Sequence, residues 1–136
     1  MSTGLLIITH GKLGQDMLET ANMIMCHCPL QVRTIGCEHD CDPDDGFAAA
    51  ADACAALDQG DGVLVITDLY GSTPSNIAAR LLERFNACVI SGLNVPMLLR
   101  ILNYPDAGLD TLADIAVEGA HSGVIVSTRE EASEHA

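Results

Sequence analysis

Two side chains capable of proton or group transfer, His10 and Asp68, each follow a short run of apolar residues. Such a run, ending at a polar residue, is typical of a strand buried on both faces of a parallel sheet. If the two strands are neighbours, their carboxyl ends bring His10 and Asp68 together. A carboxylate on one imidazole nitrogen fixes the tautomer and leaves the other nitrogen free as a nucleophile or metal ligand.

The residues that follow these two strands favour the binding of an anion. Glycines let the backbone approach closely, hydroxyls donate hydrogen bonds, and helices expected to begin next to Lys12 and Thr73 add free N–H groups. The candidate phosphate-binding residues are Gly11, Gly71, Ser72 and Thr73. A nucleophilic imidazole facing such donors is suited to accept a phosphoryl group, although these residues alone do not distinguish a phosphate site from a metal site. The Gly-rich loops typical of nucleotide sites do not occur, which disfavours a nucleotide ligand.

The elements that must position these residues alternate along the chain. Short apolar runs predict strands over residues 4–10, 30–37, 63–68, 87–91 and 123–127. Amphipathic spacing predicts helices over residues 13–28, 42–57, 73–85, 94–102 and 109–120. This alternation predicts the α/β class, as an open three-layer sandwich with a mostly parallel sheet and helices on both faces. The ligand crevice of such a sheet lies outside the carboxyl ends of its strands.

Length and composition predict one domain and exclude several classes of partner. The 136 residues are 49% hydrophobic, which fits a domain over residues 1–128 with a polar tail over 129–136. The net charge of −13 would be repelled by nucleic acid and by anionic lipid. No apolar run approaches the roughly 18 residues of a membrane span. Because the N-terminus lacks a secretory pattern, we expect a cytoplasmic protein without membrane insertion.

Three segments, residues 4–11, 62–76 and 91–98, together resemble the enzyme IIA domains of the mannose family of the bacterial sugar phosphotransferase system. The resemblance covers nearly the whole chain, to about Val126. It implies a homodimer whose parallel sheet has four strands in the order 2-1-3-4. It also implies that the last strand, over residues 123–127, is exchanged between subunits.

The same resemblance implies a role for individual residues. His10 matches the histidine that takes a phosphoryl group from the histidine-containing phosphocarrier protein and passes it to an enzyme IIB. Asp68 matches the acid that orients this histidine, and Ser72 matches a hydroxyl near the phosphate. If no IIB acceptor exists, the phosphorylation state of His10 would itself be a regulatory signal. No cofactor and no metal are implied. The expected partner contacts are Lys12, Tyr70, Asn94 and Pro96, and many relatives carry tryptophan where Tyr70 stands.

The cysteines allow an alternative metal site. Without an export signal we expect them to be reduced thiols. Cys26 and Cys28 cannot share a tetrahedral zinc ion with the later cysteines, because the strand over 30–37 separates the two groups by roughly 20 Å. A zinc site from Cys37, His39 and Cys41 stays open, against the simpler expectation of solvated loop thiols.

Two other functions are compatible with parts of the sequence. Small tetrapyrrole metal chelatases also place His-Gly after a first strand, and here His39 or His121 would have to supply their second histidine. The second of these functions is that of a pure interaction module that responds to phosphorylation. Histidine phosphatases are disfavoured, because Thr9 stands where they carry arginine. The acidic run over residues 38–45 is either a solvated loop or a docking surface for a basic partner.

Overall fold

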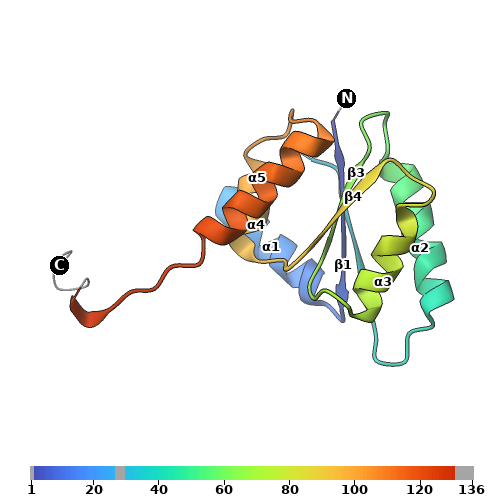
Figure 1. Ribbon diagram of the computed structural model, residues 1–136, viewed down its shortest axis with the longest axis horizontal. Coiled ribbons are helices and arrows are strands. Elements are labelled where there is room, and N and C mark those ends of the chain that lie inside the picture. Colours follow the sequence, from blue (N-terminus) through green and yellow to red (C-terminus); the bar gives the residue numbers. More distant parts are fainter. Residues whose placement is uncertain (1, 27–29, 131–136) are drawn as a thin grey trace.

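A parallel four-stranded sheet forms the centre of the computed structural model, which describes residues 2–26 and 30–130 (Figure 1). Its strands are β1 (Gly4–His10), β2 (Val32–Cys37), β3 (Val63–Thr67) and β4 (Ala87–Ser91). They lie in the order β2-β1-β3-β4, and every neighbouring pair is parallel. The predicted α/β class and the predicted strand order are confirmed.

Five helices cover the two faces of the sheet. They are α1 (Leu13–Met25), α2 (Pro43–Leu57), α3 (Thr73–Leu81), α4 (Val95–Leu102) and α5 (Leu109–Ser122). Helices α1, α4 and α5 lie on one face, and α2 and α3 lie on the other (Figure 1). No helix within residues 2–26 and 30–130 has the length and apolar character needed to cross a bilayer.

The core is divided between these faces by the alternation of side chains along each strand. In β1, Leu5 and Ile7 pack beneath α1, α4 and α5, whereas Leu6 and Ile8 pack beneath α2 and α3. All four side chains are fully buried. This burial on both faces explains why β1 is a continuous apolar run, and it fixes the strand that carries His10 at the middle of the sheet.

The ends of the helices agree with the sequence at some positions and differ at others. Asp42 caps α2 by accepting the N–H of Asp44 at 2.9 Å, and Asn94 caps α4 by accepting the N–H of Met97 at 2.9 Å. Helix α1 ends at Met25. The predicted helix end over residues 27–28 lies outside the described residues. Helix α3 ends at Leu81 instead of residue 85, because the next three residues form tighter i→i+3 bonds.

The C-terminal segment leaves the body of the protein as an arm (Figure 1). Residues 124–128 have no strand or helix assignment. Val124, Ile125 and Val126 are 74%, 77% and 78% exposed. A strand exchanged between two chains has no partner within one chain, so the predicted exchange of residues 123–127 stays a prediction. Residues 131–136 of the predicted polar tail lie outside the described part of the chain.

Candidate functional site

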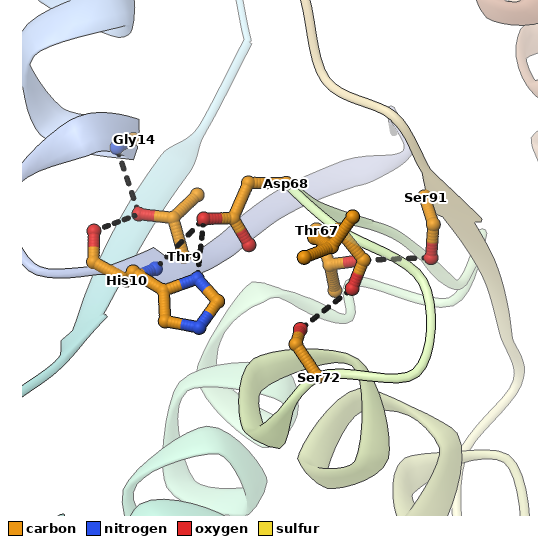
Figure 2. Close-up of polar contacts among 8 residues, drawn as sticks. Thr9, His10, Gly14, Thr67, Asp68, Ser72 and Ser91 are labelled. Carbon is orange, nitrogen blue, oxygen red and sulfur yellow. Dashed lines mark hydrogen bonds and ion pairs between the residues drawn. The ribbon is translucent and has the colours of Figure 1, made fainter. Parts of the chain in front are cut away.

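His10 and Asp68 are in direct contact at the carboxyl edge of the sheet. His10 is the last residue of β1, and Asp68 immediately follows β3. One carboxylate oxygen, Oδ2, accepts the backbone N–H of His10 at 3.0 Å and lies 2.8 Å from the ring nitrogen Nδ1 (Figure 2). The contact predicted from the two strand ends is therefore present.

The electrostatics of this pair determine which ring nitrogen is free. Burial works against the charged form of Asp68, yet hydrogen bonds from the backbone and ring of His10 hold its pKa below its ordinary value. A charged carboxylate can only accept, so Nδ1 carries the proton and donates it to Asp68. The other ring nitrogen, Nε2, then has a free lone pair. The His10 side chain is 54% exposed while that of Asp68 is 10% exposed, so Nε2 is open to an incoming group.

The side chain of Thr9 links the start of α1 to the backbone of His10 through two hydrogen bonds. These bonds are not among the sequence predictions. Its buried hydroxyl accepts the N–H of Gly14 at 2.8 Å and donates to the carbonyl of His10 at 3.2 Å (Figure 2). Lys12, at the N-cap position of α1, makes no side-chain cap. Thr9 therefore satisfies an N–H of the first helical turn that would otherwise lack a partner. A threonine that ends a buried run just before an uncapped helix is the signal that could have found it.

The loop after His10 is packed against the end of β2. Gly11 has a φ of +49°, and its N–H donates to the carbonyl of Cys37 at 2.9 Å. A Cβ atom on Gly36 would collide with the carbonyl oxygen of Gly11. Gly11 thus meets a conformational need of this turn, and Gly36 allows the close approach of the two backbones.

In the loop before α3, two of the predicted phosphate-binding residues make hydrogen bonds to other residues of the same segment. The hydroxyl of Ser72 donates to the carbonyl of Leu69 at 2.6 Å instead of capping α3 (Figure 2). The N–H of Gly71 donates to the hydroxyl of Ser75 at 3.2 Å. Thr73, the first residue of α3, is exposed. The hydroxyl of Ser72 would have to rotate away from Leu69 before it could reach a phosphoryl oxygen.

The four residues expected to contact partners fall into two groups. Lys12 is exposed in the loop after His10, and Tyr70, 85% exposed, follows Asp68 by two residues. Asn94 and Pro96 instead contact α5 and the residue after it. The side-chain amide of Asn94 donates to the carbonyl of Ala120 at 3.1 Å, and Pro96 packs against Gly123. The structure therefore gives Asn94 and Pro96 a packing role, and partner contact stays a prediction for all four.

One cysteine, Cys37, is buried where the sequence predicted a thiol exposed to solvent. Cys37 is 4% exposed, so the expectation of a solvated loop thiol is wrong for this residue, because β2 continues through it and places its side chain in the core beneath α2 and α3. Among the described residues, no group of three or more His, Cys, Asp or Glu side chains could hold a metal ion. This disfavours a zinc site at Cys37, His39 and Cys41. It also disfavours the chelatase alternative, since His121 lines a separate cavity between β4 and α5.

Comparisons with known proteins show the family of this chain. The family model described as "PTS system fructose IIA component" matches residues 4–116. The PTS system mannose-specific EIIAB component of Escherichia coli K12 is 30% identical over 131 residues, covering 91% of this chain and 39% of that protein. This chain therefore spans well under half the length of the curated relatives that it matches.

Solved structures share the fold. The phosphotransferase system component EIIA from Streptococcus agalactiae has a TM-score of 0.79 and 26% identity, over 91% of this chain and 96% of that one. The mannose/sorbose-specific IIA subunit from Enterococcus faecalis has a TM-score of 0.76 and 24% identity, over 94% and 96%. At that identity it supports the fold alone. The family match over residues 4–116 shows that the chain belongs to the fructose and mannose IIA family of the sugar phosphotransferase system (PTS).

Proposed function

We propose that this chain is a phosphoryl carrier that accepts a phosphoryl group on Nε2 of His10 and passes it to another protein. The observation that carries the proposal is the pairing of His10 and Asp68. The carboxylate holds Nδ1 at 2.8 Å, while the His10 side chain as a whole is 54% exposed. A nucleophile fixed in one tautomer and open to solvent on one side is what in-line phosphoryl transfer requires.

The proposed transfer changes the bonds at one ring nitrogen. The lone pair of Nε2 attacks the phosphorus of a donor phosphohistidine, the new N–P bond forms, and the N–P bond of the donor breaks with its electron pair returning to the donor ring. The acceptor ring, which keeps its Nδ1 proton, gains positive charge, and the carboxylate of Asp68 stabilises that charge. Onward transfer is the reverse step with a different partner. The protein has no small-molecule turnover of its own in this scheme.

The proposed partners follow from the family. The donor is the histidine-containing phosphocarrier protein, and the acceptor is an enzyme IIB. The Escherichia coli relative is named an EIIAB component, and this chain matches 39% of it. Without an acceptor, the phosphorylation state of His10 would serve as a regulatory signal. With these partners, we expect the protein to act in the cytoplasm. The acidic run over residues 38–45 would steer a basic partner, and association that is insensitive to salt would contradict that role.

We also propose a homodimer built by exchange of the C-terminal arm. The arm carries three consecutive exposed β-branched residues, and β4 is an edge strand that is only half buried. A cavity of about 280 Å³ beside β4 is lined by Ile90, Met97 and Val117 among others. Pairing the arm of one chain with β4 of the other would cover both apolar surfaces and satisfy the backbone groups of the edge.

A reconstituted transfer reaction tests the carrier function. The protein is incubated with phosphoenolpyruvate, enzyme I and the phosphocarrier protein, and we expect an acid-labile adduct that is absent in His10→Ala. His39→Ala is the matched control and should be labelled like the wild type. Adding purified IIB then separates a relay, which loses the label, from a terminal sensor, which keeps it. No adduct on the wild type would refute the proposal.

A further inference from the structure

Two thiols lie next to each other behind the His10 site. Cys37 is the last residue of β2 and is paired in register with His10. The N–H of Cys41 donates to the carbonyl of Glu38 at 3.0 Å, and this turn brings Cys41 back toward the end of the strand. The thiol of Cys41 donates to the carbonyl of Asp42 at 3.6 Å and packs against the apolar cluster to which Cys37 belongs, near enough to raise the pKa of the Cys37 thiol. The short loop thus places two sulfur atoms in one cluster.

The two thiols differ in access to solvent. Cys37 is 4% exposed and belongs to the core beneath α2 and α3, whereas Cys41 packs against that core only partly. Burial, the neighbouring Cys41 and the carboxylates of Asp68 and Glu38 raise the pKa of Cys37 to about 11. Cys37 is therefore a protonated thiol at neutral pH, and an oxidant in solution reaches Cys41 first.

We propose that Cys37 and Cys41 are an oxidation site that closes an intramolecular disulfide beside His10. The oxidant is a hydroperoxide. The thiolate of Cys41 attacks its outer oxygen, the O–O bond breaks, and the alkoxide leaves with a proton as an alcohol, giving a sulfenic acid on Cys41. The sulfur of Cys37 then attacks the sulfur of Cys41, and the thiol proton leaves with the hydroxide as water. Two electrons pass from the thiols to the peroxide.

The position of the pair couples it to the His10 loop. The carbonyl of Cys37 accepts the N–H of Gly11 at 2.9 Å, and the preceding Gly36 touches the carbonyl of Gly11. Closing a disulfide fixes the two sulfur atoms about 2.05 Å apart, which pulls on the end of β2. Since no space separates Gly36 from Gly11, the loop that follows His10 must move with it. An effect on phosphoryl transfer rests in addition on the proposed function.

Peptide mapping tests the disulfide without any phosphoryl donor. The folded protein is treated with hydrogen peroxide, free thiols are blocked, and the denatured protein is cut by a protease that cleaves after Glu38, which separates the two cysteines. We expect the Cys37 and Cys41 peptides to be joined, with a mass lower by two hydrogens. The linked species should persist in Cys26→Ser, which removes an exposed thiol elsewhere, and vanish in Cys41→Ser. Separate peptides, or Cys41 linked to another cysteine, would overturn the proposal.

A second measurement tests the coupling to the site. NMR signals of the His10 ring and of the Gly11 amide should shift between reduced and oxidised wild type, and return on reduction. The same treatment should leave them unshifted in Cys41→Ser. Phosphoryl transfer should fall by about tenfold or more, because a displacement near 1 Å can cost ~100-fold. A linked protein with unchanged His10 and Gly11 signals would refute the coupling. Shifted signals in a protein that never accepts phosphate would refute only the carrier function.

Discussion

A single oxygen of Asp68 holds both the main chain and the ring of His10. Oδ2 accepts the backbone N–H at 3.0 Å and faces Nδ1 at 2.8 Å, while the buried Oδ1 has no partner among the described residues. The orientation of the imidazole and the position of its own backbone are therefore set by the same atom. A substitution at Asp68 must therefore affect both the ring orientation and the backbone position of His10.

Replacing Asp68 by asparagine should slow phosphoryl transfer with little change in the fold. The amide is nearly isosteric and can still accept one N–H, but it carries no charge to stabilise the phosphorylated ring. We expect the rate to fall by about 100- to 10 000-fold, the range typical of losing a positioned acid–base partner. Rapid-quench measurement of transfer from the phosphocarrier protein, with circular dichroism of the variant, checks this. Asp52→Asn, on the exposed side of α2, is the control, and kinetics equal to this control would refute the orienting role.

The lowered pKa of Asp68 predicts how its contribution to stability depends on pH. The folded pKa lies below the ordinary value of 3.8, so the folded state favours the charged form. The contribution is fully present above pH 3.8 and is lost as the pH falls through the lower folded pKa. Urea unfolding of wild type and Asp68→Asn, from neutral pH to below 3.8, should show a difference in unfolding free energy that shrinks only at the acid end. A difference that is constant with pH would contradict this.

Thr9→Val should destabilise the protein and also slow the transfer. Valine keeps the shape of threonine but leaves the buried N–H of Gly14 without its acceptor, which costs about 1–3 kcal/mol. It also releases the carbonyl of His10 from the hydroxyl. Urea unfolding and initial rates of phosphorylation measure the two effects. Thr9→Ser, which retains the hydroxyl, should recover most of both, and an equal loss in serine and valine variants would show that the hydroxyl is irrelevant.

Gly36→Ala should disturb the loop after His10 from outside the site. The added methyl would collide with the carbonyl of Gly11, so we expect a loss of about 1–3 kcal/mol, typical of overpacking, together with a shifted Gly11 amide signal. Gly108→Ala is the control, because a Cβ there has no neighbour within 4 Å and any cost is confined to the N-cap of α5, far along the chain from the Gly11 amide. Unfolding free energies and an amide NMR spectrum make the comparison. Equal behaviour of the two variants would mean that the end of β2 does not hold the loop.

A charge in the arm should prevent dimer formation. Ile125→Asp places a carboxylate in the centre of the exposed β-branched run, and pairing with an edge strand would have to bury it. We expect the variant to sediment as a monomer at concentrations where the wild type is a dimer. Ile24→Asp adds the same charge to another exposed isoleucine, 57% exposed in α1, and should remain dimeric. Wild-type protein that sediments only as a monomer would refute the arm exchange.

The strand order was implied by the family resemblance, whereas the placement of His10 and Asp68 at one edge of the sheet could be predicted from the residues themselves. Apolar runs buried on both faces are continuous, so the residue that ends each run marks the carboxyl edge of the sheet. The capping roles of Asp42 and Asn94 could also be predicted from the sequence, because a cap binds a backbone N–H within three residues along the chain.

The remaining features depend on contacts between distant segments. Nothing local shows that Gly36 would be pressed against Gly11, or that Cys37 would be buried at the end of an edge strand. The hydroxyl of Ser72 is predicted from the sequence to donate to a phosphate, yet in the structure it donates to the carbonyl of Leu69, because the loop turns back on itself. The bridge made by Thr9 joins two backbone groups, so the only signal for it in the sequence is a threonine at the end of a buried run before a helix without a capping residue.

The exposed run of Val124, Ile125 and Val126 also affects the fate of any chain that stays unassembled. An uncharged, β-branched segment in solvent is a nucleus for aggregation and an accessible cleavage site for proteases. Assembly into the proposed dimer would cover this run and remove both hazards at once. In that case the amount of usable protein should rise more steeply than its rate of synthesis, since dilute chains would be lost while concentrated ones would be protected.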